Sequence, residues 1–147
     1  MHVLNQKDGS IHTLQFVMPD ELQAHQIAGS LDEIKSAFTN LVSNALRYTP
    51  SGGAVTVSCS NKNEYFKFSV KDTGFGISPE HLPRLTERFY RMDRSRSRDT
   101  GGTGLGLAIV KHVIQRHGGQ LRIDSKLNVG SCFILEFPHS RVRRKPI

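Results

Sequence analysis

Residues 30–48 read SLDEIKSAFTNLVSNALRY, and this stretch decides the fold. Ser30 is a good helix N-cap, and Glu33 stands three residues later as the second half of a capping box. The apolar residues that follow recur at helical spacing and form one stripe: Leu31, Ile34, Phe38, Leu41, Val42 and Ala45. Residues 49–53 (TPSGG) end the helix near Tyr48, because proline disfavours a helical conformation in the residue before it.

Strand patterns surround this helix. Apolar residues alternate with polar ones over residues 55–60 and 66–71, and this alternation predicts a hairpin joined through residues 61–64. The sequence also predicts strands at Ile11–Met18 and Gln23–Ala28, a short helix over His81–Arg91, a strong helix over Leu105–Arg116, and a second hairpin made of Leu121–Ser125 and Ser131–Phe137. Strands grouped in pairs between helices favour an α+β fold, with helices on one face of a sheet, over a doubly wound parallel sheet.

The length and composition suit one soluble domain, since the chain has 147 residues, of which 37% are hydrophobic. We expect this domain to span residues 1–138 and a basic tail to occupy residues 139–147. Cys59 and Cys132 lie far apart and lack a zinc-ligand spacing, which is typical of free thiols in a reducing compartment. Apolar runs of only a few residues predict no membrane-spanning helix. The net charge of +7 favours an anionic partner such as nucleic acid, phospholipid or a nucleotide.

Two glycine-rich segments, residues 72–77 and 101–106, are candidates for phosphate binding. The second has the glycine spacing of a Walker A loop, but Leu107 stands where that loop needs lysine, and the final glycine of a G-x-G-x-x-G pattern is missing. Either segment could be a simple turn. However, Gly104 and Gly106 open a predicted helix, where unpaired N–H groups and the positive end of the helix dipole can receive phosphate.

The predicted long helix also has a polar face, which is formed by Asn40, Asn44, Arg47 and Tyr48. An ordinary solvated surface is one explanation. Asparagine is a mediocre helix former, however, and an exposed face would more readily use Glu or Lys. Two asparagines one turn apart suit Mg²⁺, because this ion keeps several waters and takes few protein ligands, and neutral amides do not repel a triphosphate.

Four segments, in this order, resemble the sequence boxes of sensor histidine kinases. Residues 40–48 (NLVSNALRY) resemble the N box, residues 72–76 (DTGFG) the G1 box, residues 87–91 (ERFYR) the F box and residues 102–107 (GTGLGL) the G2 box. The resemblance covers about residues 11–138. It implies the Bergerat two-layer sandwich, a mixed sheet of about five strands covered on one face by about three helices, with a flexible ATP lid. Residues 83–91 (PRLTERFYR) are similar to phosphate-regulon sensor kinases in particular.

The resemblance implies ATP and Mg²⁺ as cofactors and gives each matching residue a role. Asn44 would ligate the metal, and Asn40 would lie beside the phosphates as a catalytic residue. Arg47 occupies a position that is usually lysine in the family, which preserves the charge. Tyr48 would pack on the adenine ring, and Asp72 would accept the hydrogen of adenine N6, so guanine would place an oxygen against a carboxylate.

The glycine boxes and the lid complete the implied site. The further residues expected to bind the nucleotide are Gly74, Gly76, Ile77, Gly102, Thr103, Gly104, Leu105 and Gly106. Arg91 is the arginine expected to contact the γ-phosphate, as the second catalytic residue. A positive charge about 4 Å away is worth roughly 4 kcal/mol at an effective dielectric constant near 20.

The histidine that accepts phosphate in the main families is followed by an acidic residue. None of the seven histidines of this chain is, so the acceptor is expected on another domain. The implied partners are a histidine-bearing dimerisation domain of a parent kinase and a response regulator of the phosphate-regulon type, with no nucleic acid and no direct membrane contact. The isolated domain is expected to be a cytoplasmic monomer, and its parent a bacterial inner-membrane protein.

Two other classes of function stay open. Bergerat-fold ATPases of the gyrase, chaperone and mismatch-repair type use a glutamate one turn before the magnesium asparagine to activate water, and Asn40 stands at that position here. A nucleic-acid-binding module is supported only by the basic charge, which lacks interleaved aromatic residues.

Overall fold

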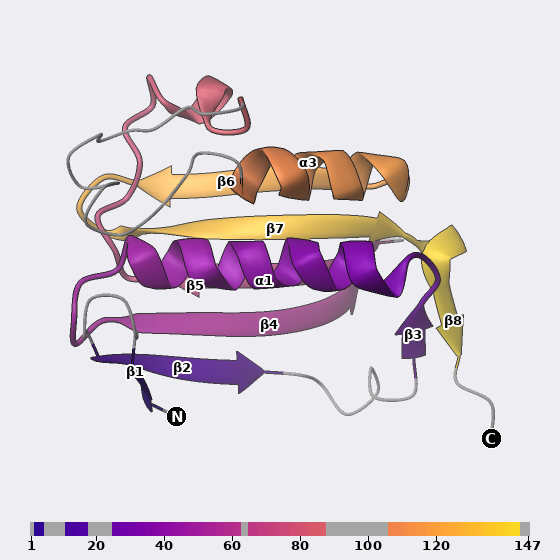
Figure 1. Cartoon of the computed structure of the whole chain (residues 1–147), viewed down its shortest axis with the longest axis horizontal. Helices are drawn as coiled ribbons and strands as arrows, with labels where there is room; N and C mark the ends of the chain where they lie inside the picture. The colour runs from indigo at the N-terminus through magenta and orange to yellow at the C-terminus, as the bar shows by residue number, and fades with distance from the viewer. Residues whose placement is uncertain (1, 5–10, 18–24, 63–64, 88–105, 145–147) are drawn as a thin grey trace.

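One mixed sheet of six strands carries two α-helices on a single face in the computed structural model of the described residues (Figure 1). The structure describes residues 2–4, 11–17, 25–62, 65–87 and 106–144. The strands, in their order across the sheet, are β1 (His2–Leu4), β2 (Ile11–Val17), β4 (Ala54–Lys62), β5 (Tyr65–Asp72), β7 (Gly130–Pro138) and β6 (Gln120–Lys126). The helices are α1 (Leu31–Arg47) and α3 (Gly106–Arg116). The predicted two-layer α+β architecture is confirmed.

The pairing within the sheet is antiparallel except between β2 and β4, which run parallel and pair Thr13–Val17 with Ala54–Ser58. Parallel neighbours need a crossover connection, and the chain between β2 and β4 supplies it by passing through α1. The fold thereby fixes α1 over the middle of the sheet.

Two predicted segments differ from the sequence-based expectation, and β1 is a strand that the sequence did not predict. The helix predicted over His81–Arg91 is a single 3₁₀ turn at Leu82–Arg84 within the described residues, and residues 88–91 lie outside them. Pro83 stands within this turn and lacks an N–H donor, and the turn is held instead by short i to i+3 hydrogen bonds. In the segment predicted as a basic tail, the 3₁₀ turn His139–Arg141 is followed by β8 (Val142–Arg144), which pairs antiparallel with β3 (His25–Ile27).

Ser30 is the N-cap of α1, as predicted, and its hydroxyl accepts a hydrogen bond from the amide of Glu33 (3.3 Å). The other hydrogen bond of the predicted capping box, from the Ser30 amide to the Glu33 carboxylate, is not formed, so this part of the prediction is wrong. The Glu33 carboxylate pairs with Arg116 (3.0 Å), and the Ser30 amide donates to Nε2 of His117 (3.1 Å). These contacts place the start of α1 against the end of α3, so the two helices lie side by side and run in opposite directions (Figure 1).

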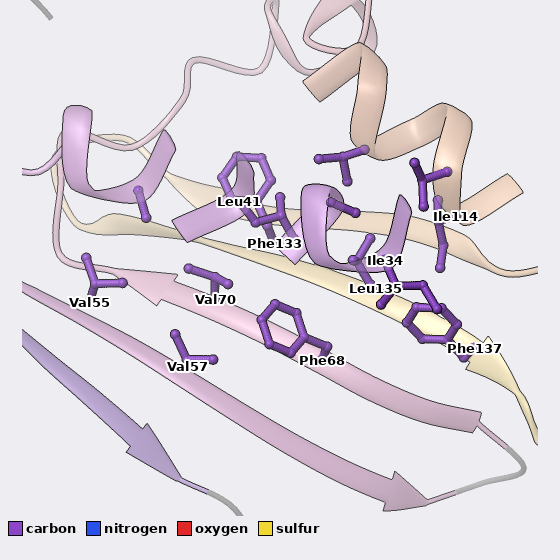
Figure 2. Packing of buried hydrophobic residues seen from close by; sticks show 14 of the residues in the cluster. Ile34, Leu41, Val55, Val57, Phe68, Val70, Ile114, Phe133, Leu135 and Phe137 are labelled. Carbon is purple, nitrogen blue, oxygen red and sulfur yellow. The ribbon is translucent and has the colours of Figure 1, made fainter. Parts of the chain in front are cut away.

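The core lies between the helices and the sheet. Helix α1 buries Ile34, Ala37, Leu41 and Ala45, whereas Leu31, which was predicted to belong to the apolar stripe, is 78% exposed at the first turn. Figure 2 shows strand residues such as Phe68, Val70 and Leu135 pointing toward the helices. Phe38 stacks on Phe68 with ring centroids 3.8 Å apart and so holds α1 on β5.

Candidate functional site

The buried face of the sheet changes from apolar to polar at the end of the sheet where β5 ends. Residues directly opposite each other on paired strands share a face, and the row Ile123, Phe133, Val70 and Val57 is apolar across β6, β7, β5 and β4. The next row is Ser125, Ser131, Asp72 and Val55. Three polar side chains therefore occupy positions that continue the core, at the edge where β5 ends.

Asp72 is the centre of this row and is only 6% exposed. Its Oδ1 accepts hydrogen bonds from the amides of Gly74 (2.9 Å) and Ser131 (3.2 Å). Burial raises the pKa of the Asp72 carboxyl, and these two hydrogen bonds oppose that rise. Within the part of the chain that the structure describes, both bonds go to Oδ1, which leaves Oδ2 able to receive a donor from a ligand.

The loop after Asp72 is held tightly against its neighbours. A side chain at Gly74 would place its Cβ 2.4 Å from the carbonyl oxygen of Tyr48, at the end of α1. Gly76 has φ +71°, and its Cβ would lie 2.1 Å from the carbonyl oxygen of Lys126. At either position a side chain would fit only if the neighbouring backbone moved, so the backbone of this loop comes close to α1 and to the β6–β7 turn.

The polar face of α1 lies along the same region. Asn40, Asn44, Arg47 and Tyr48 are all half-buried, which is unlike an ordinary solvated surface. Nδ2 of Asn40 donates to the carbonyl of Ser36 (2.9 Å), and none of the described residues donates a hydrogen bond to its Oδ1. Nε of Arg47 donates to the carbonyl of Ser43 (3.4 Å).

The first residue of α3 meets this face. A Cβ at Gly106 would lie 3.1 Å from Oδ1 of Asn40, so the N-terminus of α3 lies beside the Asn40 amide. That end of the helix carries unpaired amides and the positive end of the dipole. The structure thus brings the N-box helix, the G1 loop and the first residue of α3 together.

The remaining predicted site residues lie outside the described residues: Arg91, Gly102, Thr103, Gly104 and Leu105. Ile77 is described, and its side chain is buried in the core while its amide donates to Oγ of Ser125 (2.7 Å). Its part in nucleotide binding stays a prediction.

Sequence reasoning missed three polar residues that support the site. Ser125 and Ser131 could have been found, because each interrupts a strict apolar alternation on the face that Ile123 and Phe133 share. His12 on β2 is fully buried, and its Nε2 donates to the carbonyl of Thr49 (2.5 Å), which ties the end of α1 to the sheet. Nothing local in the sequence around His12 indicates this long-range contact.

Within the described residues, no group of three or more His, Cys, Asp or Glu residues could hold a metal ion. Among those residues, no helix has the length and apolar character needed to cross a membrane. An apolar groove of about 680 Å³ runs along the other side of α1, where Phe16, Phe38 and Phe68 line it.

Comparisons with known proteins agree with this geometry. Residues 29–141 match the family described as histidine kinase-, DNA gyrase B- and HSP90-like ATPases. The phosphate regulon sensor protein PhoR of Pseudomonas aeruginosa is 51% identical over 123 residues, which are 84% of this chain and 28% of PhoR. The chain thus spans little more than a quarter of that relative's length.

Solved structures give the same result. The mycobacterial sensor histidine kinase MprB matches with a TM-score of 0.73 at 28% identity, covering 92% of this chain and 84% of that one. Full-length ShkA in complex with AMPPNP matches with a TM-score of 0.73 at 28% identity over 86% of this chain and 25% of ShkA. The chain therefore belongs to the family of histidine kinase-, DNA gyrase B- and HSP90-like ATPases, and within that family it is similar to sensor histidine kinases.

Proposed function

We propose that this domain binds ATP together with Mg²⁺ and donates the γ-phosphoryl group to a histidine on a separate helical dimerisation domain of a sensor kinase. The names of the relatives support this reaction, and the match to ShkA, solved with AMPPNP, supports a nucleotide in this fold. The proposal rests most on one observation, the position of Asn40 Oδ1 beside the first residue of α3.

The length of the site suits an extended nucleotide. Tyr48, at one end, has its carbonyl against Gly74, and Asn40, at the other end, has its amide against Gly106. These two residues are eight positions apart on one helix, which corresponds to about 12 Å along the axis. Adenine bound near Tyr48 and Asp72 would therefore place its phosphates near Asn44 and Asn40.

The adenine end is specified by Asp72 and Tyr48. Oδ2 of Asp72 would accept the N6 hydrogen of adenine, whereas guanine presents an oxygen that leaves two acceptors facing each other. A hydrogen bond to a charged group is worth about 1.5–3 kcal/mol, and an unpaired buried acceptor costs about 1–3 kcal/mol. ATP should thus bind at least about tenfold more tightly than GTP. The Tyr48 ring would stack on the base, a contact worth roughly 1–3 kcal/mol.

The phosphate end combines amide oxygens with a helix N-terminus. Oδ1 of Asn40 and the side chain of Asn44 are neutral oxygen donors of the kind that Mg²⁺ accepts beside phosphate oxygens and waters. When bound, Mg²⁺ supplies positive charge that neutralises the phosphate oxygens. Gly106 has no side chain to keep a phosphate from the first amides of α3. Arg47, Arg91 and residues 102–105 are assigned to phosphate binding from the resemblance.

The chemistry of this chain would then be positioning and charge stabilisation. As the γ-phosphorus bonds to a ring nitrogen of the acceptor histidine, its bond to the β–γ bridging oxygen breaks and ADP leaves. Asn40 supports transfer to histidine over hydrolysis, because an amide cannot take a proton from an attacking water as a glutamate can. The similarity to PhoR supports a response regulator of the phosphate-regulon type, and the use of ATP supports a cytoplasmic location for the domain.

Calorimetric titration of the chain with ATP and with GTP, each with Mg²⁺, tests the proposal. We expect binding of ATP, binding of GTP that is at least about tenfold weaker, and no labelling of the isolated chain by ATP radiolabelled at the γ-phosphate. Addition of a dimerisation domain from a PhoR-type kinase should then give label on its histidine. Equal affinity for ATP and GTP would refute the adenine pocket, and steady ATP hydrolysis by the lone chain would favour an ATPase of the gyrase type.

A further inference from the structure

We infer that Ser125 is a positioning residue for nucleotide binding, which acts by holding the G1 loop and Ser131 in register with Asp72. This inference deepens the proposed function and rests on it. Ser125 lies on β6 directly opposite Ser131 on β7, and Ser131 lies directly opposite Asp72 on β5. The three side chains share the face of the sheet on which the G1 loop lies.

The hydroxyl of Ser125 makes contacts in three directions. Its Oγ accepts a hydrogen bond from the amide of Ile77 (2.7 Å), lies 2.8 Å from Oγ of Ser131 and lies 3.2 Å from the carbonyl oxygen of Gly130. One hydroxyl has one proton to donate and two lone pairs with which to accept, so these contacts use its full capacity. Ser125 thus joins the far end of the G1 loop to the β6–β7 hairpin.

The contacts continue from the hairpin to Asp72. The backbone amide of Ser131 donates to Oδ1 of Asp72, and the amide of Gly74 donates to the same oxygen. A second tie joins the loop to the hairpin, because the amide of Asn128 donates to the carbonyl of Phe75 (2.6 Å). Both ends of the G1 loop are therefore fixed relative to the Asp72 carboxylate, one by Asp72 itself and the other by Ser125.

Removal of the Ser125 hydroxyl should break its contact with the G1 loop and its contact with Ser131 together. In Ser125→Ala the Ile77 amide loses its acceptor and the Ser131 hydroxyl loses its partner. The residues of the site are then unchanged, but the G1 loop is no longer held in a fixed position relative to the Asp72 carboxylate. Because binding affinity depends on that relation, Ser125 would affect the nucleotide without touching it.

The test compares Ser125→Ala, Ser125→Thr and the control Ser69→Ala, which removes a hydroxyl from the opposite face of β5. We expect Ser125→Ala to bind MgATP about tenfold more weakly, the equivalent of about 1.4 kcal/mol, and to narrow the ATP-to-GTP affinity ratio. Ser125→Thr, which keeps the hydroxyl, should recover affinity to within about twofold. Ser69→Ala should bind as the wild type does.

Hydrogen exchange of the Ile77 and Gly74 amides in the nucleotide-free chain gives a second readout. Faster exchange at Ile77 in Ser125→Ala, but not in Ser125→Thr, would show that the Ser125 hydroxyl holds the G1 loop, which supports the positioning half of the inference separately from nucleotide affinity. Failure of the wild type to bind ATP would refute the proposed function alone. If Ser125→Ala bound MgATP and exchanged its Ile77 amide as the wild type does, the proposed role of Ser125 would be overturned. The same would follow if Ser125→Ala and Ser125→Thr weakened MgATP binding equally.

Discussion

Substitution of Gly76 by alanine tests a close backbone approach in the site. Two costs arise, since Gly76 has φ +71° and its Cβ would lie 2.1 Å from the Lys126 carbonyl oxygen and 2.7 Å from Cα of Leu127. A left-handed conformation costs an alanine about 1–2 kcal/mol. Relief of the overlap requires the β6–β7 turn to move, and overpacking of this kind costs about 1–3 kcal/mol. The expected loss is about 2–5 kcal/mol out of a stability of about 5–15 kcal/mol, so the variant should still fold.

Two other glycines provide matched controls. Gly118 has φ +74° and an added Cβ would meet only Cγ of Pro138, at an ordinary 3.7 Å, while Gly52 has φ +90° and nothing within 4 Å. Their alanine variants carry the dihedral cost without the overlap.

The assay is thermal unfolding of the three variants, followed by titration with MgATP. With roughly 3 °C lost per kcal/mol for a chain of this size, the melting temperature should fall by about 3–6 °C for Gly118→Ala and Gly52→Ala and by about 6–15 °C for Gly76→Ala. Gly76→Ala should also bind ATP more weakly than Gly118→Ala. If Gly76→Ala melted together with the two controls and bound ATP normally, the close packing of the G1 loop would not matter and the reasoning would fail.

Three further predictions concern Asp72, Glu136 and Leu41. Asp72→Asn should weaken ATP binding by at least about tenfold, as measured by calorimetry. The same variant should stabilise the nucleotide-free domain at neutral pH, as measured by thermal melts. The reason is that burial raises the pKa of this carboxyl, so its ionised form is unfavourable in the fold. Burial tends to raise the pKa of Glu136, but hydrogen bonds from Gln120 and Arg122 and nearby positive charges lower this pKa below 4.5. The stabilising contribution of the Glu136 carboxylate is therefore complete at neutral pH, and it is lost as the pH falls through the lowered pKa. In urea melts at pH 7 and pH 4, Glu136→Gln should thus cost stability at pH 7 and flatten the decline toward acid, and an unchanged acid decline would contradict this. Leu41→Ala empties a fully buried position on α1 and should cost about 2–5 kcal/mol in urea unfolding, whereas Leu31→Ala, at an exposed position, should change stability by less than about 0.5 kcal/mol.

Local patterns were sufficient for the two α-helices and for most strands, but not for the helix expected over His81–Arg91. The Ser30 cap, the apolar stripe and the proline after Thr49 predicted α1 to within a residue. The alternation over Phe66–Val70 predicted β5 and its buried face, because the period of a strand repeats within a few residues. These features depend on neighbours in the sequence.

Features that depend on distant residues could not be predicted in this way. Glu33 had the spacing of a capping box, but the packing of α3 brings Arg116 and His117 to the start of α1. Arg116 then pairs with the Glu33 carboxylate and His117 accepts from the Ser30 amide, so these two groups do not bond to each other. Likewise, β8 forms because Ile27 and Val142 are brought together by the fold. For the site, the motifs named the candidate residues, whereas the contact between Asn40 and Gly106 could be found only with the two helices in place.

The parallel pairing of β2 with β4 bears on how the domain is delimited. The family match starts at residue 29, which lies after β2, yet Thr13–Val17 occupy the whole outer side of Ala54–Ser58. A recombinant fragment trimmed to the matched region would leave the amides and carbonyls along that side of β4 bare, with Val55 and Val57 behind them. Such an edge recruits strands from other molecules. Pairing with β2 therefore covers an edge of β4 that would otherwise be open to strands of other molecules.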